Sequence, residues 1–161
     1  MSPDTSTHRL HEQVKSVYQL LSEPQLHIPN YQRPYKWTAD NLQALLTDLR
    51  NYRDKSAYRL GTVVFHHNSE HLDIVDGQQR TLTLMLLVKA IAERMQEHKD
   101  LIQRKDLSEQ IAELVTNIDV FLSTQPDSPH SGITHTNLYQ NYQAAKRAVA
   151  QPEFGEADIA F

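Results

Sequence analysis

The chain has 161 residues, enough for one domain with a substantial core. Its 16 Lys and Arg against 20 Asp and Glu give a net charge of −4, which argues against a free-standing basic nucleic-acid module. The absence of cysteine excludes disulfides, thiol catalysis and cysteine-ligated zinc. The N-terminus lacks a signal-peptide core, and the apolar stretch 82–92 is too short to span a bilayer. We therefore expect a cytoplasmic protein without a membrane partner.

The first half of the chain predicts two helices separated by a short strand and a loop. Apolar residues at helical spacing predict a helix over 10–21. A brief alternating run predicts a strand at 26–28, followed by a polar and aromatic loop over 30–37. Thr38 is the predicted cap of a second helix, whose apolar face continues to Leu49.

A hairpin and a buried helix are predicted next. The β-branched run 60–65 and the run 72–75 predict two paired strands, with residues 66–70 as the hairpin loop. The polar segment 76–80 leads into a helix that continues to about Gln96. Because apolar residues lie almost all round this helix, we expect it to be among the most buried elements.

The remaining residues predict further helices. An amphipathic pattern spans 107–122, a loop with two prolines spans 125–132, and a last helical pattern spans 137–149. No internal repeat is present. The expected fold class is α/β, more specifically α+β, with a small sheet surrounded by helices and followed by a helical region.

The segment Asp76-Gly77-Gln78-Gln79-Arg80 carries the strongest chemical signal. A strand–turn–helix junction directs free backbone N–H groups outward, and the helix dipole adds positive charge. Gly77 permits a turn conformation or a close backbone approach, and Arg80 supplies a donor fork suited to phosphate. Asp76 suits a metal ion held through water, or a water nucleophile. The structural alternative is that Asp76 caps the helix and Arg80 pairs with a surface carboxylate.

A second candidate is the loop segment Tyr31-Gln32-Arg33-Pro34-Tyr35-Lys36-Trp37. Aromatic side chains that alternate with cations can stack on a base and contact phosphate. The structural alternative is a stiff loop whose aromatic rings pack on the core while Arg33 and Lys36 remain solvated.

Histidines do not predict a metal site here. Neighbouring strand residues point to opposite faces, so His66 and His67 cannot easily share one ion. The sequence also lacks a Gly-x-x-x-x-Gly-Lys loop, a Gly-x-Gly-x-x-Gly motif and a Gly-x-Ser-x-Gly motif.

Three motifs in order, at 28–37, 60–64 and 74–80, resemble one family. They are similar to the N-terminal domain of GmrSD-type, modification-dependent (type IV) restriction proteins, and the resemblance covers roughly 10–95. After Arg80 this chain reads Thr-Leu-Thr-Leu where members commonly read Leu-Thr-Thr-Leu, which affects only the first-turn hydroxyl.

The resemblance implies a fold of the ParB/sulfiredoxin-like superfamily, in which a Gly-x-x-Arg turn binds nucleotide phosphates. It implies a flexible lead at 1–9, a ParB-like nucleotide-binding core at 10–97 and a helical extension at 98–161. The implied catalytic residues are Asp76, Gln78 and Arg80, and the implied nucleotide-binding residues are Tyr31, Gln32, Arg33, Gly77, Gln79 and Arg80. No residue is expected to ligate a resident metal.

The function implied by the resemblance is hydrolysis of a nucleoside triphosphate such as GTP, with Mg²⁺, by a regulatory domain of an anti-phage DNA restriction protein. Expected partners are the nucleotide, DNA through the full-length protein, a C-terminal nuclease domain or subunit, and a second copy in a homodimer. Because the chain has no HNH-type set and no natural finish at Phe161, we expect a truncated piece without nuclease action. The alternatives are a DNA-binding or DNA-nicking ParB-like module and a non-catalytic interaction scaffold.

Overall fold

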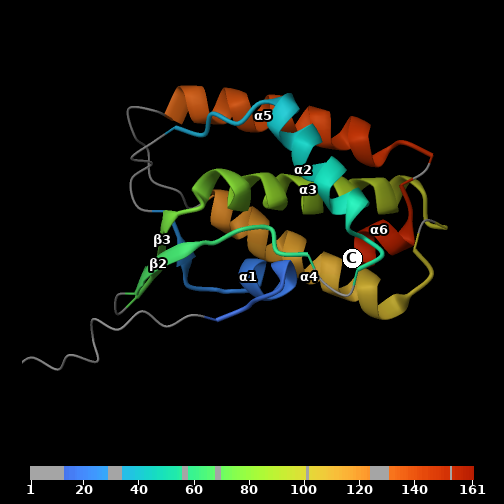
Figure 1. Cartoon of the computed structure of the whole chain (residues 1–161), viewed down its shortest axis with the longest axis horizontal. Coiled ribbons are helices and arrows are strands. Elements are labelled where there is room, and N and C mark those ends of the chain that lie inside the picture. The colour runs from blue at the N-terminus through green and yellow to red at the C-terminus, as the bar shows by residue number, and fades with distance from the viewer. Residues whose placement is uncertain are drawn as a thin grey trace, which may run out of the picture.

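The chain folds as an α+β domain, as its sequence predicts (Figure 1). A computed structural model describes residues 13–28, 34–55, 58–67, 70–100, 102–123, 131–152 and 154–161. Within these ranges the helices are α1 (Val17–Leu21), α2 (Ala39–Asn51), α3 (Gln78–Glu97), α4 (Lys105–Ser123), α5 (Ser131–Val149) and α6 (Glu156–Ala160). The strands are β1 (Leu26–His27), β2 (Val64–His67) and β3 (Leu72–Asp76).

The small sheet lies at the end of the molecule where α3 begins (Figure 1). β3 is the central strand, parallel to β1 and antiparallel to β2. The expected β2–β3 hairpin is thus confirmed. Because β3 runs directly into α3, the sheet fixes where that helix starts.

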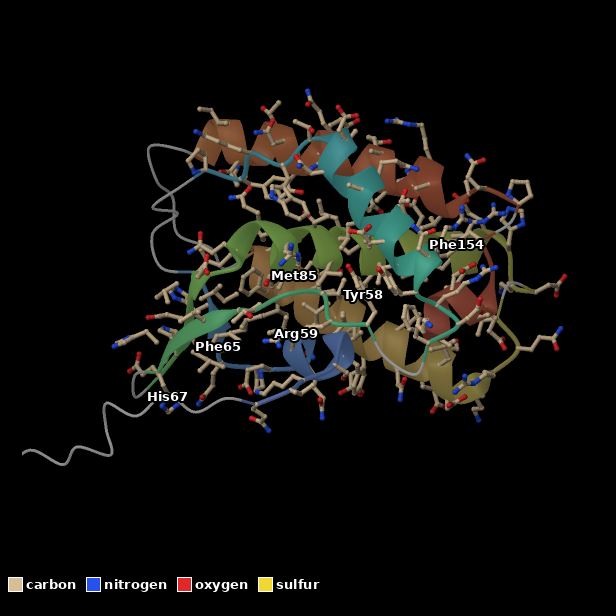
Figure 2. All side chains as sticks on the ribbon, viewed as in Figure 1. Tyr58, Arg59, Phe65, His67, Met85 and Phe154 are labelled. Carbon is tan, nitrogen blue, oxygen red and sulfur yellow. The ribbon has the colours of Figure 1, made fainter. Side chains whose placement is uncertain are left out.

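The boundaries of the hairpin differ from the prediction. β2 begins at Val64 rather than at Leu60, and His66 and His67, predicted in the loop, pair with Asp73 and Leu72. Figure 2 places His67 at the tip of the hairpin, at the end away from α3. The segment 60–63 does not join the ladder because it crosses the start of α3 instead, where its backbone packs on Gly77.

Helix α3 is the central element of the core, which confirms the prediction from its apolar surface. It lies between α5 and α4 (Figure 1). Figure 2 shows Met85 in the interior of the molecule, and this side chain is 1% exposed. The buried residues of α3 are Thr81, Leu82, Thr83, Leu84, Met85, Leu86, Leu87 and Ala90.

The later helices complete the same hydrophobic cluster. Leu114 and Ile118 from α4, Ala145 and Val149 from α5, and Phe154 are all buried in it. The predicted helices over 107–122 and after Thr38 are confirmed by α4 and α2. No helix of the described ranges is long and apolar enough to cross a membrane.

Helix α1 is shorter than predicted. It begins at Val17 because Ser16 and Gln19 form a capping box: the Gln19 N–H donates to the Ser16 hydroxyl at 3.1 Å, and the Ser16 N–H donates to the Gln19 side chain at 2.9 Å. Val14, expected on the apolar face, is 98% exposed. The predicted residues 10–12 lie outside the described ranges.

Helix α5 is longer than predicted, and α6 was not predicted. α5 begins at Ser131 rather than at Asn137, so the predicted loop over 125–132 is wrong at its end. The first turn of α5 has a tertiary partner, because the buried hydroxyl of Thr134 accepts a hydrogen bond from the backbone N–H of Tyr35. α6 is too short to carry a clear hydrophobic period.

Candidate functional site

The candidate site lies where β3 passes into α3. Gly77 is the N-cap residue and has φ +94, in the left-handed region that glycine adopts freely. A Cβ atom there would lie 3.0 Å from Val63 Cγ2 and 3.2 Å from the Thr62 carbonyl oxygen. Gly77 therefore provides both the turn conformation and the close backbone approach that the sequence predicts.

The start of α3 presents unpaired backbone donors. Gly77 has no side chain to cap the helix, and no described group accepts from the N–H groups of Gln78, Gln79 or Arg80. These groups carry the partial positive charge of the helix dipole. A phosphate oxygen is a suitable acceptor for such donors.

Arg80, in the first turn of α3, has no anionic partner among the described residues. Its Nε is buried without a hydrogen-bond partner, while Cζ lies 5.8 Å from the centroid of the Trp37 ring. The structural alternative, in which Arg80 pairs with a surface carboxylate, does not apply within these ranges. The guanidinium is thus left with unused hydrogen-bond capacity.

Asp76 does not cap α3. It is the last residue of β3, is exposed, and precedes the N-cap residue Gly77, which accepts the first helical bond from the Thr81 N–H at 3.1 Å. The exposed carboxylate at this position is therefore not used by the fold as a helix cap.

The two glutamines have structural contacts that sequence reasoning did not foresee. Gln78 Nε2 donates to the Ile74 carbonyl at 2.8 Å, which ties α3 back to β3. Gln79 Oε1 accepts from the Lys36 N–H at 2.7 Å and the Trp37 N–H at 3.2 Å. Gln79 Nε2 donates to the Pro34 carbonyl at 3.1 Å. Gln79 thereby binds the segment 34–37 to the start of α3.

A buried polar network around Tyr35 reinforces this attachment. The Tyr35 hydroxyl lies 2.6 Å from Thr83 Oγ1 and accepts from Asn141 Nδ2 at 2.7 Å. Asn137 Nδ2 also donates to the Tyr35 carbonyl, at 2.6 Å. Burial raises the pKa of Tyr35, although the two side-chain hydrogen bonds act in the opposite direction. For Tyr35, the prediction that loop aromatics pack on the core is confirmed, and Lys36 is exposed.

Three predicted nucleotide-binding residues, Tyr31, Gln32 and Arg33, lie outside the described ranges. The segment that follows them directly, 34–37, is held against the first turns of α3 by Gln79 and Thr83. The expected meeting of the two motifs at one site remains a prediction for Tyr31, Gln32 and Arg33 themselves.

Two features of this region were missed in the sequence. Asn141 lies on α5, far from both motifs, and a lone Asn inside an apolar helical pattern was the available signal of a buried polar contact. Gly61 contacts the end of Arg80, and its place ahead of a β-branched run was the available signal of a close backbone approach.

His27 and His71 form contacts at the sheet. His27 Nδ1 lies 2.9 Å from Asp73 Oδ1, and the His27 and His71 rings stack with centroids 4.3 Å apart. In the described part of the chain no group of three or more His, Asp or Glu is arranged to hold a metal ion.

A hollow of the described surface lies elsewhere. It measures about 380 Å³ and is bordered by α2, α5 and Phe154, with Arg50 and Arg147 among its lining residues. No residue of 76–80 lines it. The candidate site is marked by the backbone donors of α3 and by Arg80.

Comparison with known proteins agrees with the motifs. The family model for the GmrSD restriction endonuclease, N-terminal domain, matches residues 17–155. No curated protein and no solved structure matches the chain. The match covers α1 through Gly155 and includes the strand–turn–helix junction at Gly77. The chain therefore belongs to the family of N-terminal domains of GmrSD restriction endonucleases.

Proposed function

We propose that this domain binds and hydrolyses a nucleoside triphosphate at the start of α3, and that it thereby regulates a restriction protein that acts on phage DNA. Membership of the GmrSD family supports the restriction role and a nuclease part that acts on DNA. The nucleotide chemistry is inferred from the residues at 76–80 and from the ParB/sulfiredoxin-like pattern Gly77-x-x-Arg80.

The observation that carries the proposal is the unused cation of Arg80 beside unpaired backbone donors. Its Nε is buried without a partner, and no described carboxylate neutralises it. Withdrawing Nε from water without a hydrogen-bond partner is unfavourable, and a bound anion would offset that cost. An oxyanion that bridges the guanidinium and the first backbone amides of α3 would accept hydrogen bonds from both groups of donors.

Asp76 and Gln78 are the proposed catalytic partners of Arg80. Gln78 uses Nε2 on the Ile74 carbonyl, which leaves its Oε1 without a described partner and suited to orient a water molecule. We propose that Gln79, whose amide is occupied at both ends, acts by holding the segment 34–37 rather than by contacting the ligand.

The residues fit a magnesium ion that arrives with the nucleotide. Mg²⁺ is commonly held by one or two carboxylates together with phosphate oxygens and waters, and Asp76 provides one exposed carboxylate beside the proposed phosphate position. The ion, when bound, neutralises charge on the phosphates. Asp76→Asn is therefore expected to lower turnover more than nucleotide affinity.

The direct test is a calorimetric panel of GTP, ATP and their diphosphates against the 161-residue chain, with and without Mg²⁺. Saturable binding of a triphosphate, strengthened by Mg²⁺, supports the proposal. If no nucleotide gives a heat of binding, the proposal is contradicted and the alternative of a non-catalytic interaction scaffold is favoured. Turnover is measured in the full-length protein, since the whole protein includes the nuclease part expected from the family.

A DNA-binding role of this domain alone is the second candidate. Affinity for DNA comes largely from neutralised phosphates, and a net charge of −4 disfavours it. A DNA mobility shift that weakens steeply with salt and does not change when nucleotide is added would favour this candidate over triphosphate hydrolysis.

A further inference from the structure

The guanidinium of Arg80 lies against the backbone of Gly61. A Cβ atom at Gly61 would lie 2.1 Å from Nη1 and 3.1 Å from Cζ of Arg80. Carbon atoms do not approach non-bonded groups so closely, so any side chain at this position has to displace the guanidinium. Gly61 therefore leaves open the space that the end of Arg80 occupies.

Trp37 borders the same cation from another part of the chain. Its ring centroid lies 5.8 Å from Arg80 Cζ, within the range of a cation–π contact. The backbone of Trp37 is held on both sides. Its backbone N–H donates to Gln79 Oε1, and its backbone carbonyl accepts from Asn141 Nδ2 at 2.7 Å. The end of Arg80 is thus bordered by a glycine and by the ring of a tryptophan whose backbone is held on both sides.

The segment 61–63 contacts α3 at a second point. Val63 Cγ2 and the Thr62 carbonyl oxygen lie 3.0 and 3.2 Å from the position that a Cβ of Gly77 would take. Two glycines on opposing segments therefore set how closely 61–63 approaches the start of α3. Gly61 also has φ +145, which strains any residue with a side chain, so its backbone conformation is a separate reason for glycine.

We propose that Gly61 is a positioning residue of the phosphate site, which together with Trp37 fixes the direction of the Arg80 fork. This inference rests on the proposed function. A bidentate contact requires both Nη groups to lie in one plane with two phosphate oxygens. The group that a methyl at position 61 would strike is the far end of a flexible side chain. Gly61→Ala is therefore expected to displace the guanidinium, in addition to straining the backbone at position 61.

The test is a double-mutant cycle read by affinity for inorganic triphosphate with Mg²⁺, a probe that needs no base recognition. Gly61→Ala and Arg80→Ala are each expected to weaken binding about tenfold or more. The double variant is expected to bind no more weakly than Arg80→Ala alone, because the guanidinium that Gly61 positions is then absent. Gly132→Ala is the control, since a Cβ there meets nothing within 4 Å, and it keeps wild-type affinity.

The outcomes separate this inference from the proposed function. Wild-type affinity in Arg80→Ala overturns the proposed function. A weak Arg80→Ala variant beside an unaffected Gly61→Ala variant overturns the positioning role alone. If the losses of affinity from the two single variants multiply in the double variant, the positioning role of Gly61 is also overturned. Backbone strain at Gly61 then acts independently of Arg80.

A second measurement needs no variant at Gly61. In the wild-type chain, the contacts of Arg80 with Gly61 and Trp37 are expected to slow rotation about the Cζ–Nε bond, which gives separate NMR signals for the two Nη groups. One averaged Nη signal, as in a freely rotating exposed arginine, contradicts the positioning role whatever the variants do.

Discussion

The hydroxyl groups of Tyr35 and Thr83 lie 2.6 Å apart, and both residues are 0% exposed. Thr83 also donates to the Gln79 carbonyl at 2.8 Å, so its hydroxyl connects the segment 34–37 with the backbone of the first turns of α3. The loop beside the candidate site is thus anchored by buried polar contacts as well as by apolar packing.

Tyr35→Phe is expected to lower the free energy of unfolding by about 1–2 kcal/mol. The change removes the hydroxyl between Thr83 and Asn141, but each partner keeps another hydrogen bond, so the loss is moderate. Urea denaturation measures the difference. Tyr139→Phe, at a 66% exposed position of α5, is the matched control and should leave the midpoint unchanged. Equal stability of the two variants would contradict the anchoring role of Tyr35.

Leu86→Ala is expected to lower the free energy of unfolding by about 2–5 kcal/mol. Leu86 is 4% exposed in α3, and removing its side chain leaves a cavity among α3's neighbours. Ile133→Ala, on a residue that is 54% exposed in α5, serves as control and should cost far less. Comparable losses in the two variants would mean that α3 is not the central helix.

Gln79→Leu is expected to detach the segment 34–37 from α3. It removes the acceptor of two backbone N–H groups and the donor to Pro34, and leaves those groups without their partner. The chain has one tryptophan, Trp37, so its fluorescence emission should shift to longer wavelength as the ring becomes more exposed. An unchanged emission spectrum in a folded Gln79→Leu variant would show that Gln79 does not hold this segment.

Glu93 makes stability depend on acid pH. The hydrogen bond from the Tyr142 hydroxyl, followed by that from Lys146 at 3.1 Å, lowers the pKa of Glu93. A carboxyl whose pKa is lowered by folding stabilises the protein above its unfolded pKa, about 4.5. That contribution is lost as the pH falls through the lower pKa of the folded state.

Thermal unfolding midpoints from pH 7 down to pH 3 test this dependence. Glu93→Gln should reduce the acid destabilisation, whereas Glu109→Gln, at an exposed surface pair on α4, should retain the wild-type profile. Parallel profiles for wild type and Glu93→Gln would contradict the assignment.

The sequence predicted the elements of this fold whose signals are local. The all-round apolar surface of α3, the leucine face of α2 and the β-branched hairpin strands each follow from neighbouring residues. The first turn of α5 is held by the hydrogen bond between the Tyr35 N–H and the Thr134 hydroxyl. These residues are distant in sequence, so the local hydrophobic pattern could not predict this contact or the early start of α5. The same holds for the β2 boundary, because 60–63 leaves the ladder to pack on Gly77.

The placement of Gly77 and Arg80 was predictable from the motif, but the contacts of Gln79 and Gly61 were not. Gly77 and Arg80 lie where the motif places them, at the cap and first turn of α3. The motif could not show that both amide ends of Gln79 are occupied, since its partners at 34–37 are distant in sequence. It also could not show that Gly61 makes room for Arg80, because that contact depends on tertiary packing.

A triphosphate site built on Arg80 is tested by measuring nucleotide affinity in Arg80→Ala and Arg80→Lys. Both variants are first checked for wild-type circular dichroism and unfolding midpoint. Arg80→Ala is expected to weaken triphosphate binding about ten- to a hundredfold or more. Arg80→Lys is expected to restore little of this affinity, because an ammonium lacks the planar fork. Wild-type triphosphate affinity in a folded Arg80→Ala variant would show that Arg80 does not bind the triphosphate.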